Sequence, residues 1–147
     1  MGLKGKLIAS MEVKCGGHLV HDIFHINAHH IPNISPSKVN HFEIHEDEIL
    51  KIGSIVSWKY NHDGKEKFAK QVIEAIDPPT KSITWKVIEG DVLQSYNSFI
   101  VITYCDHQWT TVDLKNEKKI EDTPEPLTLL DFFIGVINDI ESHLLKK

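Results

Sequence analysis

The sequence predicts an α+β fold in which a curved antiparallel sheet of about seven strands surrounds one long helix. Three segments place large apolar groups on one face with a period of two, which is typical of strands that bury that face. A single long apolar helix follows these segments near the end of the chain. The apolar faces consist of Val56, Trp58 and Tyr60, of Ile83, Trp85 and Val87, and of Phe99, Val101 and Thr103.

An apolar cavity follows from the dimensions of this arrangement. Strands spaced roughly 4.8 Å apart give a sheet of about seven strands a width of about 30 Å, whereas a helix with its side chains is roughly 10 Å across. Because one helix cannot fill such a hollow, we expect a helix-grip architecture with an open space between the sheet and the helix. The partner that this space predicts is a small hydrophobic molecule.

The composition is that of one domain, 1–147, without a structural cofactor. The chain has 147 residues, of which 41% are apolar, and this is enough to bury a core without metals or disulfides. A net charge of -5 with mixed acids and bases gives no basic stripe, so we expect no nucleic-acid partner. Two cysteines and no hydrophobic leader favour a cytoplasmic protein with reduced thiols. No apolar run approaches membrane-spanning length, and a monomer is the default expectation.

The N-terminal part predicts one strand and a short helical stretch. Leu7, Ala9, Met11 and Val13 alternate with polar neighbours, and the glycine pair 16–17 ends that strand. From residue 18 to about residue 27 the apolar side chains share one side of a helical wheel, and the prolines at 32 and 36 then break the chain. The apolar side is formed by Leu19, Val20, Ile23 and Phe24.

Six more strands follow, joined by turns. Asp63-Gly64 and Asp77-Pro78-Pro79 are typical turn sequences. Connections this short force antiparallel pairing, because parallel strands need long crossovers. We therefore expect the strands from residue 39 onward to form a meander. The predicted strands are 39–46, 53–61, 66–75, 82–88, 96–104 and 109–115.

The last segment predicts a helix that begins at Thr123-Pro124 and runs to Leu145. Threonine is a capping residue, and proline is favoured at the first helical position. Gly135 costs roughly 1 kcal/mol in a helix interior. We expect it either to allow a close approach or to leave room for a ligand, unless it is simply packed. The apolar arc that faces the sheet contains Leu129, Phe132, Phe133, Val136, Ile137, Ile140 and Leu144.

The hairpin around Asp63-Gly64 has two possible registers, and they place opposite faces of the fourth strand in the cavity. A three-residue loop pairs Asn61 with Lys65 and places Trp58 opposite Phe68. It turns Phe68, Val72, Glu66 and Lys70 inward, and we favour it because an aromatic ring then joins the core. A two-residue turn would instead point Lys67, Ala69, Gln71 and Ile73 inward.

Three runs of the sequence resemble the plant major latex proteins, a branch of the Bet v 1 and PR-10 superfamily. They are KIGSIVSWKYNHDGK at 51–65, VIEGDVLQSYNSF at 87–99 and the closing TLLDFFIGVINDIESHLL. The resemblance implies a plant source, a seven-stranded antiparallel sheet that grips a long C-terminal helix, two short helices after the first strand and a large cavity. Members of this superfamily carry or sense lipids, hormones and specialised metabolites, often in defence responses, and some relatives catalyse isomerisation or cyclisation.

Two loops depart from the pattern of the resembling proteins. The loop at 45–51 lacks the glycines that pollen allergens have there and carries Asp47 where latex proteins usually have glycine. The connection at 105–108 is several residues shorter than in most members. We expect a different shape in the first loop and a trimmed cavity rim at the second.

The sequence predicts a binding protein that carries, sequesters or senses a small hydrophobic metabolite or lipid, without a cofactor. Most of the inward-facing residues are aromatic or aliphatic, as a pocket for such a molecule requires. The ligand itself is not specified, since aromatic walls accept many shapes. The predicted ligand-binding residues are Phe24, Val56, Trp58, Tyr60, Phe68, Trp85, Val87, Phe99, Val101, Thr103, Phe132, Phe133, Val136 and Ile140.

An alternative is a cofactor-independent cyclase or isomerase of a terpenoid or alkaloid intermediate. No Gly-x-Ser-x-Gly turn or phosphate-binding glycine loop is present. General acid or base chemistry by a desolvated polar side chain stays open. The candidates are Glu66, Lys70, His62 and Tyr60. Glu66 and Lys70 could instead lie in water near the rim of the cavity, His62 could simply belong to a turn and Tyr60 could simply pack in the core.

Ten histidines are present, and four of them recur at helical spacing. His18, His21, His25 and His29 would lie on one stripe, which is a spacing that can bind a metal. That stripe lies opposite the apolar face, so we interpret it as the solvated side of an amphipathic helix. No metalloprotease-type motif or paired cysteine motif accompanies it, and we expect no dedicated metal site.

Overall fold

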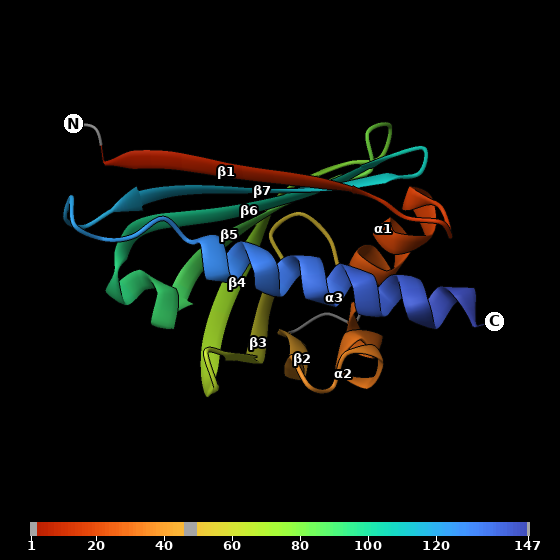
Figure 1. Cartoon of the computed structure of the whole chain (residues 1–147), viewed down its shortest axis with the longest axis horizontal. Helices are drawn as coiled ribbons and strands as arrows, with labels where there is room; N and C mark the ends of the chain where they lie inside the picture. The colour runs from red at the N-terminus through yellow and green to blue at the C-terminus, as the bar shows by residue number, and fades with distance from the viewer. Residues whose placement is uncertain (1–2, 46–49, 147) are drawn as a thin grey trace.

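The computed structural model describes residues 3–45 and 50–146 as a seven-stranded antiparallel sheet that curves around one long helix. Figure 1 shows α3 lying along the concave side of the sheet, with α1 and α2 near the C-terminal end of α3. The α+β helix-grip prediction is therefore confirmed. The elements are β1 (Lys4–Glu12), α1 (Gly17–His25), η1 (Ala28–His30), α2 (Ile31–Ile34), β2 (Val39–His45), β3 (Ile55–His62), β4 (Lys65–Asp77), β5 (Ser82–Gly90), η2 (Asp91–Gln94), β6 (Tyr96–Asp106), β7 (Trp109–Lys118) and α3 (Leu127–Leu145).

The strand order is β1-β7-β6-β5-β4-β3-β2, so β2 to β7 form the predicted meander and β1 pairs with the last strand. Side chains on β5 and β6 alternate between buried and more exposed positions, as the period-two pattern predicted. Two register shifts interrupt the pairing of β4 with β5, at Lys70/Gln71 and at Ile73/Ala75. Bulges of this kind bend a strand and help a sheet to curve.

The β3–β4 hairpin has the register that we did not favour. His62 pairs with Lys65 and Trp58 pairs with Ala69, so the loop is the two-residue turn Asp63-Gly64. Both turn residues have positive φ, 55° and 76°, as a type I′ turn requires. The prediction that Phe68 faces the cavity is consequently wrong: Phe68 lies on the outer face and is 38% exposed. The backbone twist of the tight turn sets the register here, and one exposed aromatic ring does not outweigh it.

The long helix begins later than predicted. Its first residue is Leu127, preceded by Pro126, and no side chain caps it, so the predicted start at Thr123-Pro124 is wrong. The hydroxyl of Tyr96 donates a hydrogen bond to the carbonyl of Pro124 over 2.6 Å. Proline also disfavours helical backbone in the residue before it, here Glu125. These two constraints keep residues 123–126 out of the helix.

The short β6–β7 connection supports the start of α1. The carbonyls of His107 and Gln108 accept hydrogen bonds from the backbone N–H groups of Gly17 and Val13, over 2.7 and 2.6 Å. A Cβ at Gly17 would lie 2.8 Å from the carbonyl oxygen of Trp109, so this packing requires glycine. The connection is as short as the sequence indicated. Of the other departing loop, residues 46–49 lie outside the described residues.

Lys38 explains the glycine in the middle of α3. A Cβ at Gly135 would lie 2.6 Å from Cε of Lys38, so the lysine stem occupies the space that the glycine leaves. The ammonium group donates to Asp139 Oδ2 over 2.9 Å, and Ser35 Oγ donates to the same oxygen over 2.5 Å. Gly135 therefore serves packing rather than ligand space. This cluster ties α3 to the segment that joins α2 and β2.

Asp139 is expected to make the stability of the protein pH dependent. Burial alone would raise the pKa of the carboxyl, but the bonds from Ser35 and Lys38 more than offset this and hold the pKa below its ordinary value. A depressed folded-state pKa stabilises the protein above the unfolded pKa of about 4, and this stabilisation is lost as the pH falls through the folded value. Asp139→Asn should cost about 1 kcal/mol at neutral pH and less near pH 3, measured by urea unfolding.

Asp131→Asn provides the control for that comparison. Asp131 is exposed on the same helix and has no hydrogen-bond or ion-pair partner among the described residues. Its substitution should leave the unfolding free energy unchanged at both pH values. An Asp139→Asn effect of the same size at both pH values would contradict the proposed role of the charge.

Within residues 3–45 and 50–146, none of the helices combines the length and the apolar character needed to cross a lipid bilayer. Both cysteines, Cys15 and Cys105, are free thiols, and burial is the main cause that raises the pKa of each.

Candidate functional site

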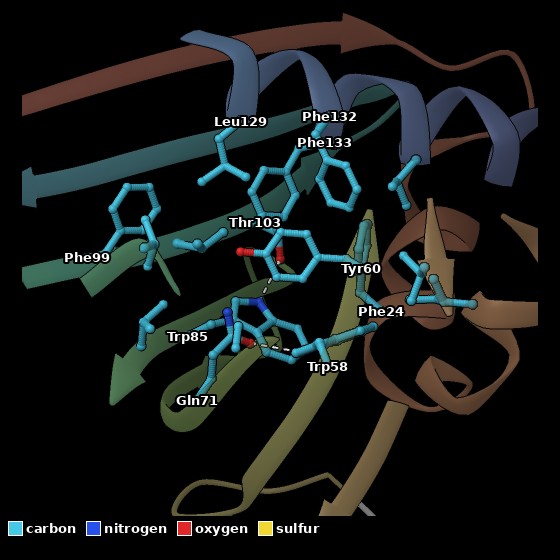
Figure 2. A pocket seen from close by; sticks show the side chains of 17 residues that line it. Phe24, Trp58, Tyr60, Gln71, Trp85, Phe99, Thr103, Leu129, Phe132 and Phe133 are labelled. Carbon is cyan, nitrogen blue, oxygen red and sulfur yellow. Dashed lines mark hydrogen bonds between the residues drawn. The ribbon is translucent and has the colours of Figure 1, made fainter. Parts of the chain in front are cut away.

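An apolar pocket lies between the concave face of the sheet and α3. Figure 2 shows its lining side chains converging from the strands, from α3 and from Phe24 of α1. Nearly all of these side chains are aromatic or aliphatic. The pocket is lined by Phe24, Ile31, Val39, Trp58, Tyr60, Ala69, Gln71, Trp85, Val87, Val92, Phe99, Val101, Thr103, Leu129, Phe132, Phe133 and Val136.

The free space in this pocket is small. The cavity volume is about 80 Å³, which corresponds to roughly five to eight waters. The rings of Tyr60 and Phe132 pack against each other with centroids 5.3 Å apart, and Phe132 and Phe133 meet edge to face at 5.6 Å. All three rings belong to the lining of the pocket. The large cavity that the family resemblance implied is thus only partly open, and a larger guest requires the rings to move.

Eleven of the fourteen predicted ligand-binding residues line the pocket, and three do not. Val56 and Ile140 are fully buried in the surrounding core, and Phe68 lies on the outer face for the reason given above. Whether the eleven contact a ligand stays a prediction. The eleven are Phe24, Trp58, Tyr60, Trp85, Val87, Phe99, Val101, Thr103, Phe132, Phe133 and Val136.

Six lining residues were not among the predicted ligand-binding residues. Ala69 and Gln71 belong to the inward set of the two-residue turn, so the correct register identifies them. Val92 belongs to the four-residue helix η2, which is too short to show a periodic pattern in the sequence. Leu129 was already placed on the apolar arc of the helix. The remaining two, Ile31 and Val39, flank the proline-interrupted segment between α1 and β2.

The few polar groups of the pocket are arranged in pairs. The indole Nε1–H of Trp58 donates to Oε1 of Gln71 over 2.9 Å, and that of Trp85 donates to Oγ1 of Thr103 over 3.4 Å. Figure 2 draws both bonds as dashed lines. Among the described residues, the phenol of Tyr60 has no hydrogen-bond partner. In Figure 2 its oxygen lies among the lining side chains, at the end of the ring remote from its strand.

Tyr60 is the polar group whose ionisation the pocket changes most. Burial, with a smaller contribution from the charge of Asp91, raises the pKa of Tyr60 to about 12. Below about pH 10 the phenol is neutral in both folded and unfolded chains, and between about pH 10 and 12 only the unfolded chain ionises. The free energy of unfolding should therefore fall by about 2 kcal/mol as the pH rises through this window, because only the unfolded chain then releases the proton.

Tyr60→Phe supplies the comparison for this prediction. Phenylalanine keeps the ring and cannot ionise, so the variant should lack that part of the alkaline loss of stability, as measured by urea unfolding at pH 9 to 11.5. A parallel absorbance titration should show one fewer late-ionising phenol. Identical alkaline stability profiles for the two proteins would show that Tyr60 ionises normally.

The other three catalytic candidates do not line the pocket. On the outer face, Glu66 accepts a hydrogen bond from Asn40 over 2.8 Å, and Lys70 pairs with Glu89 over 3.1 Å. His62 lies beside the pocket: its Nε2 is 3.0 Å from Oγ1 of Thr128, and its ring meets Phe132 edge to face. The inward orientation of Glu66 and Lys70 was therefore wrong, because it depended on the three-residue loop.

The histidine stripe is only partly solvated. His18 and His29 are exposed, but His21 is buried at 7% exposure, which corrects the interpretation of a wholly solvated side. Burial is the largest cause that lowers the pKa of His21, and the neighbouring His25 adds to it. Among residues 3–45 and 50–146, no three histidine, cysteine, aspartate or glutamate side chains are arranged to hold a metal ion.

Comparison with known proteins places this geometry in a family. The sequence model of the pathogenesis-related protein Bet v 1 family matches residues 2–147. The chain is 38% identical over 151 residues to MLP-like protein 43 of Arabidopsis thaliana, covering 99% of the chain and 96% of the relative. It is 36% identical over 154 residues to MLP-like protein 31 of the same plant, covering 88% of that relative.

Solved structures with the same fold include one of high and one of low sequence identity to this chain. The crystal structure of major latex-like protein 151 from Panax ginseng has a TM-score of 0.93 at 37% identity and covers 98% of this chain and 99% of that one. Norcoclaurine synthase from Thalictrum flavum, in complex with dopamine and hydroxybenzaldehyde, has a TM-score of 0.77 at 16% identity. The two chains are covered to 97% and 87%, and this second likeness is one of fold alone.

Proposed function

The chain belongs to the pathogenesis-related protein Bet v 1 family and to its major latex protein branch, and on that premise we propose that it binds a small hydrophobic molecule in the pocket between the sheet and α3. Binding would serve to carry, sequester or sense a metabolite or lipid. The single observation that supports this most is the lining itself, which is mainly apolar and is contributed by the sheet, α1, α2, η2 and α3.

The energetic argument for binding comes from the buried apolar surface. Burying apolar surface contributes about 25 cal/mol per Å², and an aromatic wall of this size offers it on several sides of a guest. The rings of Trp58 and Phe42 contact each other at a tilt of 51° with centroids 4.3 Å apart, so a second aromatic residue on the paired strand β2 packs against this part of the wall. The apolar wall of the pocket is thus held in place by packing against other side chains.

Catalysis as a cyclase or isomerase is the weaker proposal on this geometry. Acid or base catalysis needs a group whose pKa lies near the working pH. Of the four candidates, Tyr60 alone lines the pocket, and its pKa of about 12 makes it a poor acid or base at neutral pH. The described lining residues include no carboxylate, lysine or histidine.

A pocket-filling variant tests the proposed binding. N-phenylnaphthylamine is uncharged and becomes fluorescent in apolar surroundings, so its titration reports on an apolar site. Ala69 lines the pocket and is 7% exposed, and Ala69→Phe should place a ring in the free space and weaken dye binding at least about tenfold. The smaller substitution Ala69→Leu should produce an intermediate loss.

Ala75→Phe is the matched control, because Ala75 is exposed on the same strand and the substitution adds the same ring outside the pocket. It should leave the dye affinity unchanged, and circular dichroism should show that both variants are folded. Equal affinities of wild type, Ala69→Phe and Ala75→Phe, or no dye binding by any of them, would overturn the proposal.

A further inference from the structure

We infer that the pocket selects uncharged apolar molecules that carry a hydrogen-bond-accepting oxygen, such as a ketone or lactone carbonyl, over molecules that carry an ammonium group and over pure hydrocarbons. This inference rests on the proposed binding function and specifies its ligand class. Its basis is which hydrogen-bonding groups of Gln71, Thr103 and Tyr60 are already used by the protein and which are left free.

Two acceptors of the pocket are used by indole groups. An indole N–H can only donate, so the bond from Trp58 fixes the Gln71 amide with Oε1 toward the indole. The bond from Trp85 likewise makes Oγ1 of Thr103 an acceptor. Both bonds are made between side chains of the protein.

The unused groups are therefore mainly donors. Among the described residues, the Gln71 Nε2 hydrogens and the Tyr60 hydroxyl have no partner, and the Thr103 hydroxyl hydrogen is also free of one. A carbonyl oxygen offers two lone pairs and no hydrogen, so it complements these donors. A hydrocarbon leaves them unpaired in an apolar pocket, which costs free energy.

A charged guest meets a different obstacle. An ammonium group needs an anionic partner when it leaves water, and the described lining residues include no carboxylate. Asp91 lies near Tyr60, but its carboxylate accepts a hydrogen bond from the backbone N–H of Phe68 over 2.7 Å and does not line the pocket. A carboxylate guest has no cation among the described lining residues and would face the charge of Asp91.

Three compounds of one shape test this selectivity. Adamantanone, methyleneadamantane and aminoadamantane share a rigid cage and differ in carrying an acceptor oxygen, no polar group or an ammonium. Their affinities are measured by displacement of N-phenylnaphthylamine from the wild-type protein. The ketone should bind about fivefold more tightly than the methylene compound and at least about tenfold more tightly than the amine.

Two variants connect the preference to the named groups. Tyr60→Phe should reduce the preference for the ketone over the methylene compound about threefold. Gln71→Glu keeps an acceptor for Trp58 but replaces the amide donors by a carboxylate, so it should shift the preference toward the amine. Tyr104→Phe removes a hydroxyl from the outer side of β6 and should leave all three affinities unchanged.

The outcomes separate this inference from the proposed function. Dye binding by wild type but not by Ala69→Phe supports the binding function. Given that result, the inference alone is wrong if the three compounds displace the dye equally, if the amine displaces it best, or if the ketone fails to displace it. Ketone preference that survives both Tyr60→Phe and Gln71→Glu would also overturn it. If the dye itself does not bind, the proposed function fails first.

Discussion

Replacement of Gly90 by alanine is expected to destabilise the protein by about 3 to 5 kcal/mol, the largest effect that we expect of a single substitution here. Gly90 has a φ of 136°, which L side chains rarely adopt. A Cβ at this position would collide with the carbonyl oxygen of Phe68 and would lie 2.9 Å from Cα of Ala69. Both obstacles are backbone atoms of the paired strand, so they cannot move aside as a flexible side chain would.

The Gly90 position also matters for the pocket. Gly90 ends β5 and leads into η2, which supplies Val92 to the lining, and its partner Ala69 is a lining residue. A displaced strand end at Gly90 should therefore weaken dye binding as well as stability. The measurement is urea unfolding, followed by dye titration under conditions in which the variant is still folded.

Gly53→Ala separates strain from collision. Gly53 has a φ of 93°, but no atom lies within 4 Å of a Cβ built there. This control should lose only about 1 to 2 kcal/mol, from backbone strain. Equal losses for Gly53→Ala and Gly90→Ala would show that the close approach of the two strands contributes nothing.

Replacement of Phe133 by alanine is expected to have the second largest effect. It should lower the stability of the protein but raise its affinity for the dye. Phe133 is half-buried on α3 and its ring lies in the pocket beside Phe132. Its loss should destabilise the protein by about 2 to 3 kcal/mol. Because the free space is only about 80 Å³, removing this ring should also let N-phenylnaphthylamine bind about tenfold more tightly.

Phe68→Ala is the control for Phe133→Ala, because it removes the same ring from the outer face. It should change the unfolding free energy by less than about 1 kcal/mol and leave the dye affinity unchanged. Weaker dye binding by Phe133→Ala would contradict the account, because it would mean that this ring forms the binding surface instead of filling the space.

The sheet could be predicted from the sequence because alternation and turn chemistry agree there. The runs around Trp85 and Val101 have apolar residues at every second position, and the structure buries those residues. Most of the pocket lining follows from these same residues. The agreement reflects a physical constraint, since the side-chain period of a strand is fixed at two.

The face of β4 could not be settled from its composition. Phe68 and Val72 on one face and Ala69 and Ile73 on the other give similar hydrophobic patterns, so apolar content alone does not choose between them. The turn decides, because Asp63 adopts positive φ and closes a two-residue loop. Asp-Gly is a strong signal for a two-residue turn, and such a turn points Gln71 into the cavity.

The start of α3 and the size of the cavity depend on contacts that are distant in sequence. Residues 123–126 stay outside the helix partly because Tyr96, from the start of β6, binds the carbonyl of Pro124. The space left between sheet and helix depends on how the rings of Tyr60, Phe132 and Phe133 fold inward. Local pattern carries no information about either arrangement.

The most direct test of the central claim is a crystal structure of the protein with bromonaphthalene, an uncharged apolar compound whose bromine is located by anomalous scattering. We predict a bromine peak between the sheet and α3, in contact with Trp85, Tyr60 or Phe133, and rotated aromatic rings beside it. A peak only on the outer face of the sheet, or an empty pocket in crystals of a protein that binds the compound in solution, would contradict the account.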